Sequence, residues 1–319
     1  MITVFFIYGL AFFTLGTVIA LYPKKGSAFA IARHIRLVAA FGLVHGTHEW
    51  LEMFERIYGA GRFPPVDLFS FITLPFSFSF LIFFGTKLIR STKGESPFLK
   101  WLPFVLIAAW GLSTALSADT LRTGGILSRY MLAAPGILLT SYALMLQKNV
   151  FRKAGLQTVS THFSAAAGAF LLYAFFAGLI VPEADFFPAS VLNYANFLDA
   201  TGVPVQAFRA LCALVITYGM ARVLGIFDWE TRKTVIKALD DLEIRVEERT
   251  SELKEAKDKI ERSLREKEVL LQEIHHRIKN NLQLISSLLS LQARHAEDAI
   301  YKEMFRECQN RIMSMTFVH

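Results

Sequence analysis

Two adjacent histidines in the C-terminal part of the chain have the features of a reactive side chain. His275 and His276 lie in the run 273–283, where apolar residues recur every three or four positions, as on one face of a helix. His276 falls between two of these apolar positions, so its ring is expected to point sideways into solvent. An exposed imidazole is largely neutral near pH 7, and its free nitrogen is then a nucleophile. The spacing therefore predicts an exposed nucleophile at His276, with the adjacent His275 as the alternative.

A second group of ionisable residues lies in the apolar N-terminal part of the chain. Spacings of three, four and seven place its members on one face of a helix: His45, His48, Glu49 and Glu52. Ionisable groups in an apolar helix usually face the interior of a helix bundle. Three interpretations remain open: a hydrogen-bonded structural cluster, a pocket that senses a ligand or protons, and a metal site.

The metal interpretation has limited support from the sequence. His45, His48 and Glu49 are ligand types that suit zinc, copper or iron. No other apolar run offers an obvious further ligand at the same depth. A haem between His34 and His162 is a weaker alternative of the same kind.

The elements that position both groups are expected to be helices, most of them in a membrane. The chain has 319 residues, of which 53% are hydrophobic, and a mean hydropathy of +0.40, which is too apolar for a soluble domain of this size. Apolar runs of about 20 residues match the thickness of a bilayer. The first run has no preceding basic residue and no cleavage site, so it reads as a span and not as a removed signal peptide. Seven spans are expected, at 2–22, 28–54, 67–89, 101–118, 125–147, 158–181 and 203–225.

The basic residues predict the orientation of these spans, because cytoplasmic loops are enriched in Lys and Arg. One side has 11 of them: Lys24, Lys25, Arg33, Arg36, Lys87, Arg90, Lys93, Lys100, Lys148, Arg152 and Lys153. The other has 5: Arg56, Arg62, Arg122, Arg129 and Arg209. We therefore expect the N-terminus outside and the C-terminus in the cytoplasm, as an odd number of spans requires. The net charge of +7 has this local cause and gives no support to nucleic-acid binding.

The composition changes after Phe227. Residues 228–273 are rich in charged residues, and an apolar stripe with three-four spacing runs through them: Val235, Leu239, Leu242, Val246, Leu253, Ala256 and Ile260. Such a stripe predicts a parallel dimeric coiled coil. A helix from about 299 to the end would follow a turn near 294–298, and two such hairpins would form a four-helix bundle. The expected fold is all-α: a seven-helix membrane domain at 1–227, a coiled coil at 228–264 and a dimeric hairpin at 265–319.

The run from His276 onward resembles a known family. It reads His, Arg, Ile, Lys, Asn, Asn, Leu, which is similar to the phosphoacceptor helix of bacterial sensor histidine kinases of the H-R-x-K-N-N type. The flanking residues 270–273 and 282–292 and the closing residues 309–319 also resemble that subfamily. Two positions depart from the commoner histidine kinase box: Arg277 replaces its acid, so another group must take the proton, and Asn281 replaces its proline.

The resemblance implies a function, partners and cofactors. His276 would accept the γ-phosphoryl group of ATP with Mg²⁺, within a homodimer in the bacterial inner membrane, and pass it to an Asp of a response regulator. Asn280 would orient a water for the phosphatase reaction, and Arg277 and Lys279 would contact the phosphate or the partner. The ATP-binding domain that the family places next does not follow, so we expect the chain to be the N-terminal part of a longer kinase, with a naturally short phosphotransfer protein as the alternative.

Two other classes of protein remain open. The ionisable group at 45–52 is compatible with a transporter or with a metal-binding membrane protein that has a regulatory tail. The stimulus and the response regulator are not indicated by the sequence.

Overall fold

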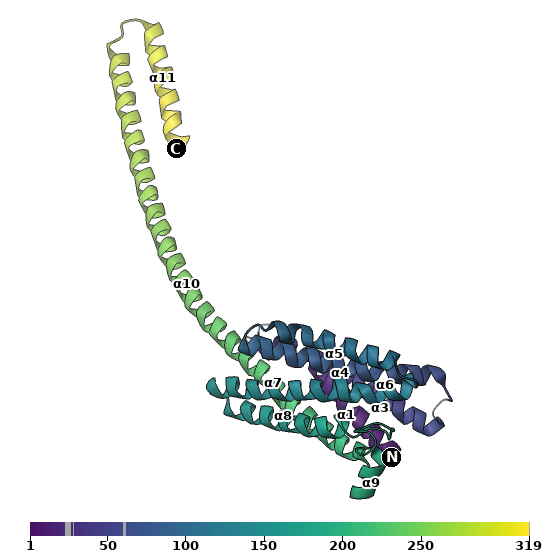
Figure 1. Cartoon of the computed structure of the whole chain (residues 1–319). Helices are drawn as coiled ribbons and strands as arrows, with labels where there is room; N and C mark the ends of the chain where they lie inside the picture. The colour runs from purple at the N-terminus through teal and green to yellow at the C-terminus, as the bar shows by residue number, and fades with distance from the viewer. Residues whose placement is uncertain (23–26, 28, 60–61, 319) are drawn as a thin grey trace. The chain divides into compact units, whose positions relative to one another are not determined.

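The computed structural model describes residues 1–22, 27, 29–59 and 62–318, and it is helical throughout (Figure 1). In these residues the only β-type pairing is an isolated bridge between Val181 and Asn193. The predicted all-α fold is therefore confirmed. Lys24 and Lys25, which contribute to the expected charge asymmetry, lie outside the described residues.

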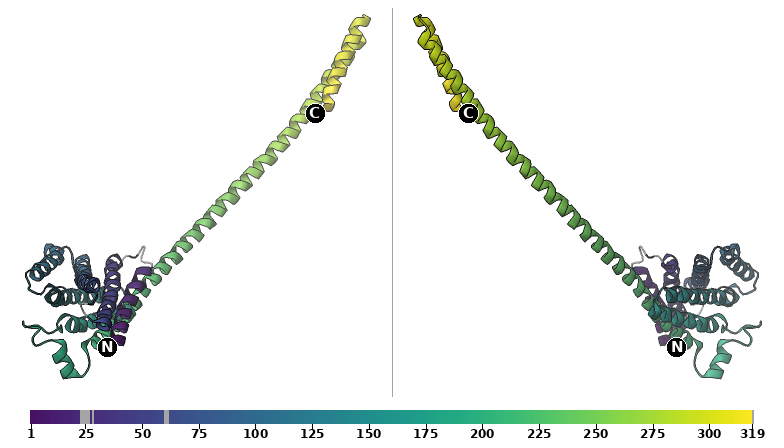
Figure 2. Two further views of the ribbon diagram at one scale, coloured as in Figure 1. Left: turned by 90° about the vertical axis from the view of Figure 1, so that its right-hand side faces the viewer. Right: turned by 90° about the vertical axis from the view of Figure 1, so that its left-hand side faces the viewer.

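The chain divides into two units, at 1–235 and 236–319. The first unit contains a long-helix bundle, seen from two further directions in Figure 2. Its helices are α1 (Ile2–Leu21), α2 (Ala30–His34), α3 (Arg36–Tyr58), α4 (Pro64–Lys93), α5 (Pro97–Ala115), α6 (Thr120–Ser128), the π-helical turn η1 (Arg129–Ala133), α7 (Ala134–Lys153), α8 (Gln157–Gly178), α9 (Tyr194–Thr201) and the first part of α10 (Val205–His295). A large apolar core, with aromatic members such as Phe41, Phe78 and Phe170, fills most of the space between them, and a smaller cluster lies at Ile126, Val181 and Ala189.

Six helices in the described part of the chain are long and apolar enough to cross a membrane: α1, α4, α5, the run from α6 to α7, α8 and α10. The expected second span, now seen as α2 and α3, is not among them. The C-terminal half of α3 carries Glu49, Glu52, Glu55 and Arg56, which lower its apolar character. The count of seven spans and the division into three domains stay predictions.

Close packing against α1 fixes the position of α3. A Cβ at Gly42 would lie 2.6 Å from the carbonyl oxygen of Phe12, and a Cβ at Gly46 would lie 2.6 Å from that of Gly9. Both distances are far below van der Waals contact, so only glycine permits this approach of two backbones. His45 lies between these two glycines, and its place in the bundle is set by them.

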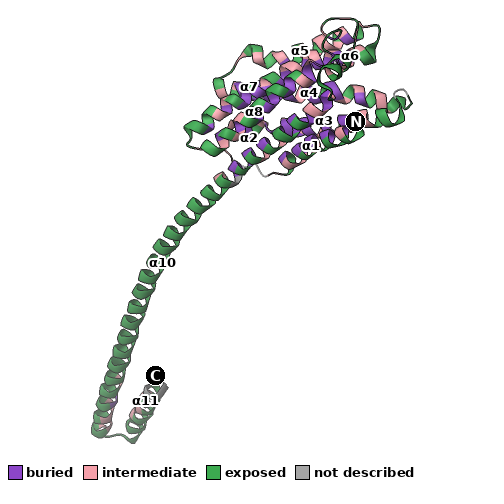
Figure 3. Ribbon diagram, turned by 90° about the horizontal axis from the view of Figure 1, so that it is seen from below, coloured by how far each residue is buried: buried purple, intermediate pink, exposed green. Residues whose placement is uncertain are grey.

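The second unit contains the rest of α10 and α11 (Ala299–Val318), which are joined by a short turn. The turn falls within two residues of the predicted one. Most side chains of this unit are exposed in the single chain, including the predicted coiled-coil stripe, of which Leu239 is 58% exposed and Leu253 70% (Figure 3).

Candidate functional site

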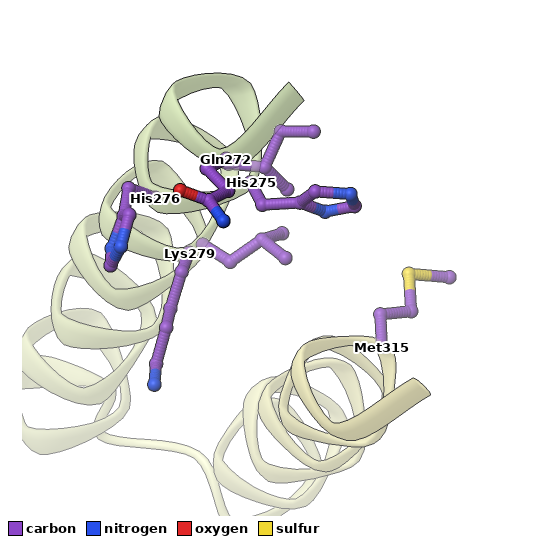
Figure 4. A pocket seen from close by; sticks show the side chains of 7 residues that line it. Gln272, His275, His276, Lys279 and Met315 are labelled. Atoms are coloured by element: carbon purple, nitrogen blue, oxygen red, sulfur yellow. The ribbon is translucent and has the colours of Figure 1, made fainter. Parts of the chain in front are cut away.

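His276 is exposed on α10, as are its apolar neighbours Ile274 and Ile278 in the single chain. The predicted orientation of its ring between buried neighbours therefore stays a prediction. A cavity of about 240 Å³ is lined by Gln272, His275, His276, Ile278, Lys279, Leu282 and Met315. In Figure 4, His276 and His275 project from different sides of α10, with His275 on the side of Met315 in α11. Since Lys279 lies next to His276, its ammonium group is placed to contact an anion on that ring.

The other predicted residues of this site are also exposed. Arg277 Nε donates to Glu273 Oε1 at 2.6 Å, so the arginine that replaces the usual acid holds a carboxylate one turn before it. Asn280 is exposed on the same helix, one turn after His276, and does not line the cavity. Sequence analysis missed the cavity residues Gln272 and Met315. Gln272 lies one turn before His276 on the same helix and could have been found by spacing, whereas Met315 belongs to another helix.

Comparison with known proteins gives the same result for this region. The family model described as histidine kinase, HisKA_2, matches residues 273–319. Residues 273–319 form a histidine kinase phosphoacceptor domain. The sensor histidine kinase PdtaS of Mycobacterium tuberculosis is 44% identical to this chain over 59 residues, and that of Mycolicibacterium smegmatis is 42% identical over 59 residues. Each match covers 18% of this chain and 12% of the relative. No solved structure matches the chain.

The second candidate site lies outside the residues of the phosphoacceptor domain. His45 is fully buried at the centre of a hydrogen-bonded group. Its Nε2 lies 2.7 Å from the Tyr173 hydroxyl of α8 and 3.3 Å from the Tyr8 hydroxyl of α1. Its Nδ1 lies 3.0 Å from Ser77 Oγ of α4. These contacts join α1, α3, α4 and α8 at one point.

The predicted face of α3 does bring its four ionisable residues together. Glu49 Oε1 lies 3.4 Å from His45 Nε2, and Glu52 Oε1 lies 3.2 Å from His48 Nε2. A guanidinium nitrogen of Arg129 lies 3.2 Å from the same Glu52 oxygen. Arg129 begins η1, and such π-helical turns redirect side chains within a regular helix. The result is a buried group of mixed charge. We call its four members on α3, His45, His48, Glu49 and Glu52, the residues 45–52 cluster.

Two arginines that were counted with the outer side of the membrane are buried inside the bundle. Arg129 is 2% exposed and Arg209 is 1% exposed. Arg209 donates to the carbonyl oxygen of Phe176 at 2.8 Å, in the last turn of α8, and to that of Ile180 at 2.6 Å, just after the helix ends. Both arginines fall within predicted apolar runs, and a charge in such a run needs internal partners. That signal could have found them, although not the partners themselves.

Neither metal interpretation gains a ligand set from the structure. Over the described ranges, no group of three or more His, Cys, Asp and Glu residues is placed to hold a metal ion. His34 Nε2 is hydrogen-bonded to Ser91 Oγ at 2.8 Å, whereas His162 packs edge-on against Tyr218. The histidines considered for a haem therefore have different neighbours.

Proposed function

We propose that this chain is the sensory and phosphoacceptor part of a membrane-bound two-component histidine kinase. The observation that carries the proposal is the phosphoacceptor domain at 273–319, with His276 exposed on its first helix. A stimulus acting on the N-terminal helices would change the phosphorylation of His276, and the phosphoryl group would pass to an Asp of a response regulator.

The chemistry at His276 is phosphoryl transfer from ATP to a ring nitrogen. ATP and Mg²⁺ would be supplied by an ATP-binding domain, and Mg²⁺ neutralises phosphate charge during the transfer. Lys279 and Arg277 provide cationic groups on the same stretch of helix. Glu273 is held by Arg277 one turn after it and lies three residues before His276 on the same helix, so we assign it the role of assisting removal of the imidazole proton. Asn280 would orient a water for dephosphorylation.

The membrane part of the proposal is supported by the outer surface of the first unit. Large apolar side chains are exposed on several of its helices, among them Phe76, Leu112, Leu172 and Leu211, each more than half exposed. An exposed apolar surface of this kind is stable in lipid and costly in water. Glu49 and Glu52 of α3 face inward, whereas Arg36 and Arg56 are exposed near the two ends of the helix. This distribution is compatible with α3 as a further span.

The homodimer is supported by the exposed apolar stripe of α10. Leu239, Leu242 and Ile260 are each more than half exposed in the single chain. A second copy packed along this stripe would bury them as the a and d positions of a coiled coil. The hairpins of the two copies would then form the four-helix bundle.

Phosphoryl transfer is tested by supplying an ATP-binding domain in trans with labelled ATP. Acid-labile label is expected on the wild type and on His275→Ala, and none on His276→Ala. Full label on His276→Ala together with its loss from His275→Ala would move the acceptor to His275. An absence of label from all three would refute the phosphoacceptor assignment.

The orientation is tested with the native cysteines. Cys308 is exposed on α11 and Cys212 is buried in α10, so a membrane-impermeant maleimide should label Cys308 alone. We expect labelling in inverted membrane vesicles and none in intact spheroplasts, with Cys308→Ser as the control. Labelling of intact spheroplasts at Cys308 would place the phosphoacceptor domain outside and contradict the proposal.

A further inference from the structure

The residues 45–52 cluster contains two histidine–glutamate pairs of the same design. In each, a histidine ring nitrogen faces a carboxylate one helical turn later: His45 with Glu49 at 3.4 Å, and His48 with Glu52 at 3.2 Å. Three of the four side chains are at most 2% exposed, and Glu52 is 19% exposed. The positions of the hydrogens in these pairs follow from their neighbours.

In both histidines, Nδ1 is the hydrogen-bond donor. Ser77 uses its single hydroxyl hydrogen on a carbonyl of its own helix at 2.7 Å, so its oxygen accepts from His45 Nδ1 at 3.0 Å. Thr73 likewise donates to a carbonyl of its helix at 2.8 Å and accepts from His48 Nδ1 at 3.2 Å. A neutral imidazole with a hydrogen on Nδ1 presents a lone pair at Nε2.

At His48 that lone pair faces Glu52, whereas at His45 it accepts from the Tyr173 hydroxyl at 2.7 Å, with Glu49 Oε1 further away at 3.4 Å. At His48, two acceptors would face each other at 3.2 Å, which is repulsive unless a proton lies between them. At Glu49, neither carboxyl oxygen accepts a hydrogen bond from any residue in the described ranges, although the side chain is fully buried. An unpaired buried carboxylate is very costly. A proton between His48 and Glu52 removes the repulsion and creates a charge-assisted hydrogen bond. A proton on Glu49 makes it a neutral acid, and a proton on His45 Nε2 supplies a cation beside it.

We propose that these two pairs form a proton-binding site, and that protons from the outer side of the membrane are a stimulus of this sensor. This proposal adds a stimulus to the proposed function, and it rests on that function for the resulting change in phosphorylation of His276. The proton is added to or removed from a ring Nε2 or a carboxyl oxygen, and no other bond is made or broken.

We call His45 with Glu49 the inner pair and His48 with Glu52 the outer pair. The neighbouring charges indicate that the inner pair is the one that changes its charge. The titratable and charged groups that face the cluster from other helices are Tyr8 of α1, Arg129 of η1, Tyr173 of α8, Tyr194 of α9 and Arg209 of α10. From α4 it is faced by uncharged hydroxyls. Arg129 balances Glu52 at 3.2 Å, whereas among the described residues only His45 lies at salt-bridge distance from Glu49. Glu49 therefore depends on its histidine, or on its own proton, for neutralisation.

Water reaches the outer pair through a cavity. The cavity has a volume of about 460 Å³ and is lined by Glu52, Glu55, Arg56, Gly59, Pro182 and Tyr194. Glu52 thus belongs both to this cavity and to the pair with His48. From there the exposed fraction falls to 2% at His48, 1% at Glu49 and 0% at His45, which gives a graded route for a proton from water to the inner pair.

The inner pair is connected to the helix that carries the phosphoacceptor. When His45 Nε2 gains a proton, it can no longer accept from the Tyr173 hydroxyl, and that hydrogen bond must reverse or break. Tyr173 lies three residues before Phe176, whose carbonyl oxygen is held by Arg209 of α10 at 2.8 Å. Arg209 and His276 belong to the same uninterrupted helix. A change at His45 is therefore transmitted through α8 to the start of α10.

Proton binding is tested by infrared difference spectroscopy of the full chain in lipid nanodiscs, between about pH 8 and about pH 5. We expect a carboxylic acid C=O band that titrates in the wild type and is lost in Glu49→Gln. The control is Glu95→Gln, which removes an exposed carboxylate outside the cluster and should keep the band. His45→Gln keeps the Glu49 carboxyl group and should shift the midpoint of the band by about one pH unit or more. A band of full amplitude in Glu49→Gln, or no titrating band in the wild type, would overturn the proposal.

The link to signalling is tested separately in proteoliposomes that contain the ATP-binding domain at a constant inner pH. The rate of His276 labelling is expected to change about fivefold or more with outer pH in the wild type, and to be independent of outer pH in Glu49→Gln. Equal responses of the two proteins would refute the link. Because proton binding is measured without phosphoryl transfer, a failure of labelling at all pH values would count against the proposed kinase function and leave the proton site standing.

Discussion

Removal of the Arg129 guanidinium is expected to destabilise the N-terminal unit strongly. Its nitrogen lies 3.2 Å from Glu52 Oε1, and the two side chains are 3% and 19% exposed. Arg129→Met fills much of the same volume but leaves a largely buried carboxylate with only His48 beside it. Breaking a buried ion pair by removing one partner costs about 3–5 kcal/mol. Because Glu52 keeps some contact with water, we expect the lower end, about 3 kcal/mol.

A double-mutant cycle separates the interaction energy of the Arg129–Glu52 pair from the effect of shortening either side chain. Glu52→Gln together with Arg129→Met leaves neither charge behind, and such replacements of a buried pair are often close to neutral. The double variant should therefore be more stable than Arg129→Met alone, with a coupling energy of about 2 kcal/mol. The assay is reversible unfolding of the purified protein in mixed micelles, with the free energy of unfolding extrapolated to zero denaturant.

The matched control is an exposed ion pair in the same unit. Arg90 and Glu95 form a salt bridge in which Glu95 is 77% exposed, so Arg90→Met should cost less than about 1 kcal/mol. The reasoning is refuted if Arg129→Met costs no more than Arg90→Met. It is also refuted if the double variant shows the simple sum of the two single losses.

Three further perturbations have defined outcomes. Gly42→Ala places a Cβ 2.6 Å from a backbone oxygen of α1 and should lower the free energy of unfolding by about 1–3 kcal/mol. The control Gly168→Ala has open space around it and should be neutral or stabilising. Similar losses in the two variants would show that the α1–α3 contact is not tight. Leu242→Lys should weaken the dimer in sedimentation equilibrium, and the control Glu243→Lys should not. An unchanged dimer in Leu242→Lys would show that the stripe lies outside the interface. Asn280→Ala should slow loss of the phosphoryl group without reducing its uptake, and a pulse-chase measurement with an unchanged rate of loss would remove this role.

The phosphoacceptor region could be predicted closely from the sequence because its information is local. The seven-residue pattern from His276 is specific for one family. The turn between α10 and α11 was predicted within two residues, since charged and small residues interrupt both apolar stripes there. Helical periodicity alone was sufficient for these features.

The interior of the membrane unit was only partly predictable. Spacing placed four ionisable residues on one face of α3, but their partners come from distant parts of the chain: Arg129 is 77 residues from Glu52, and Tyr173 is 128 residues from His45. Periodicity identifies the buried face of a helix and not the helices that it meets. The same charges that form the cluster also removed α3 from the helices apolar enough to be recognised as spans.

The most direct test of the account is to locate the phosphoryl group on the unmodified chain. After labelling with an ATP-binding domain in trans, peptides would be mapped by tandem mass spectrometry under conditions that preserve phosphohistidine. The account predicts a single phosphoryl group on His276. A phosphoryl group on His275, or on a residue outside 273–319, would contradict it, and no variant protein is needed whose loss of label might reflect misfolding.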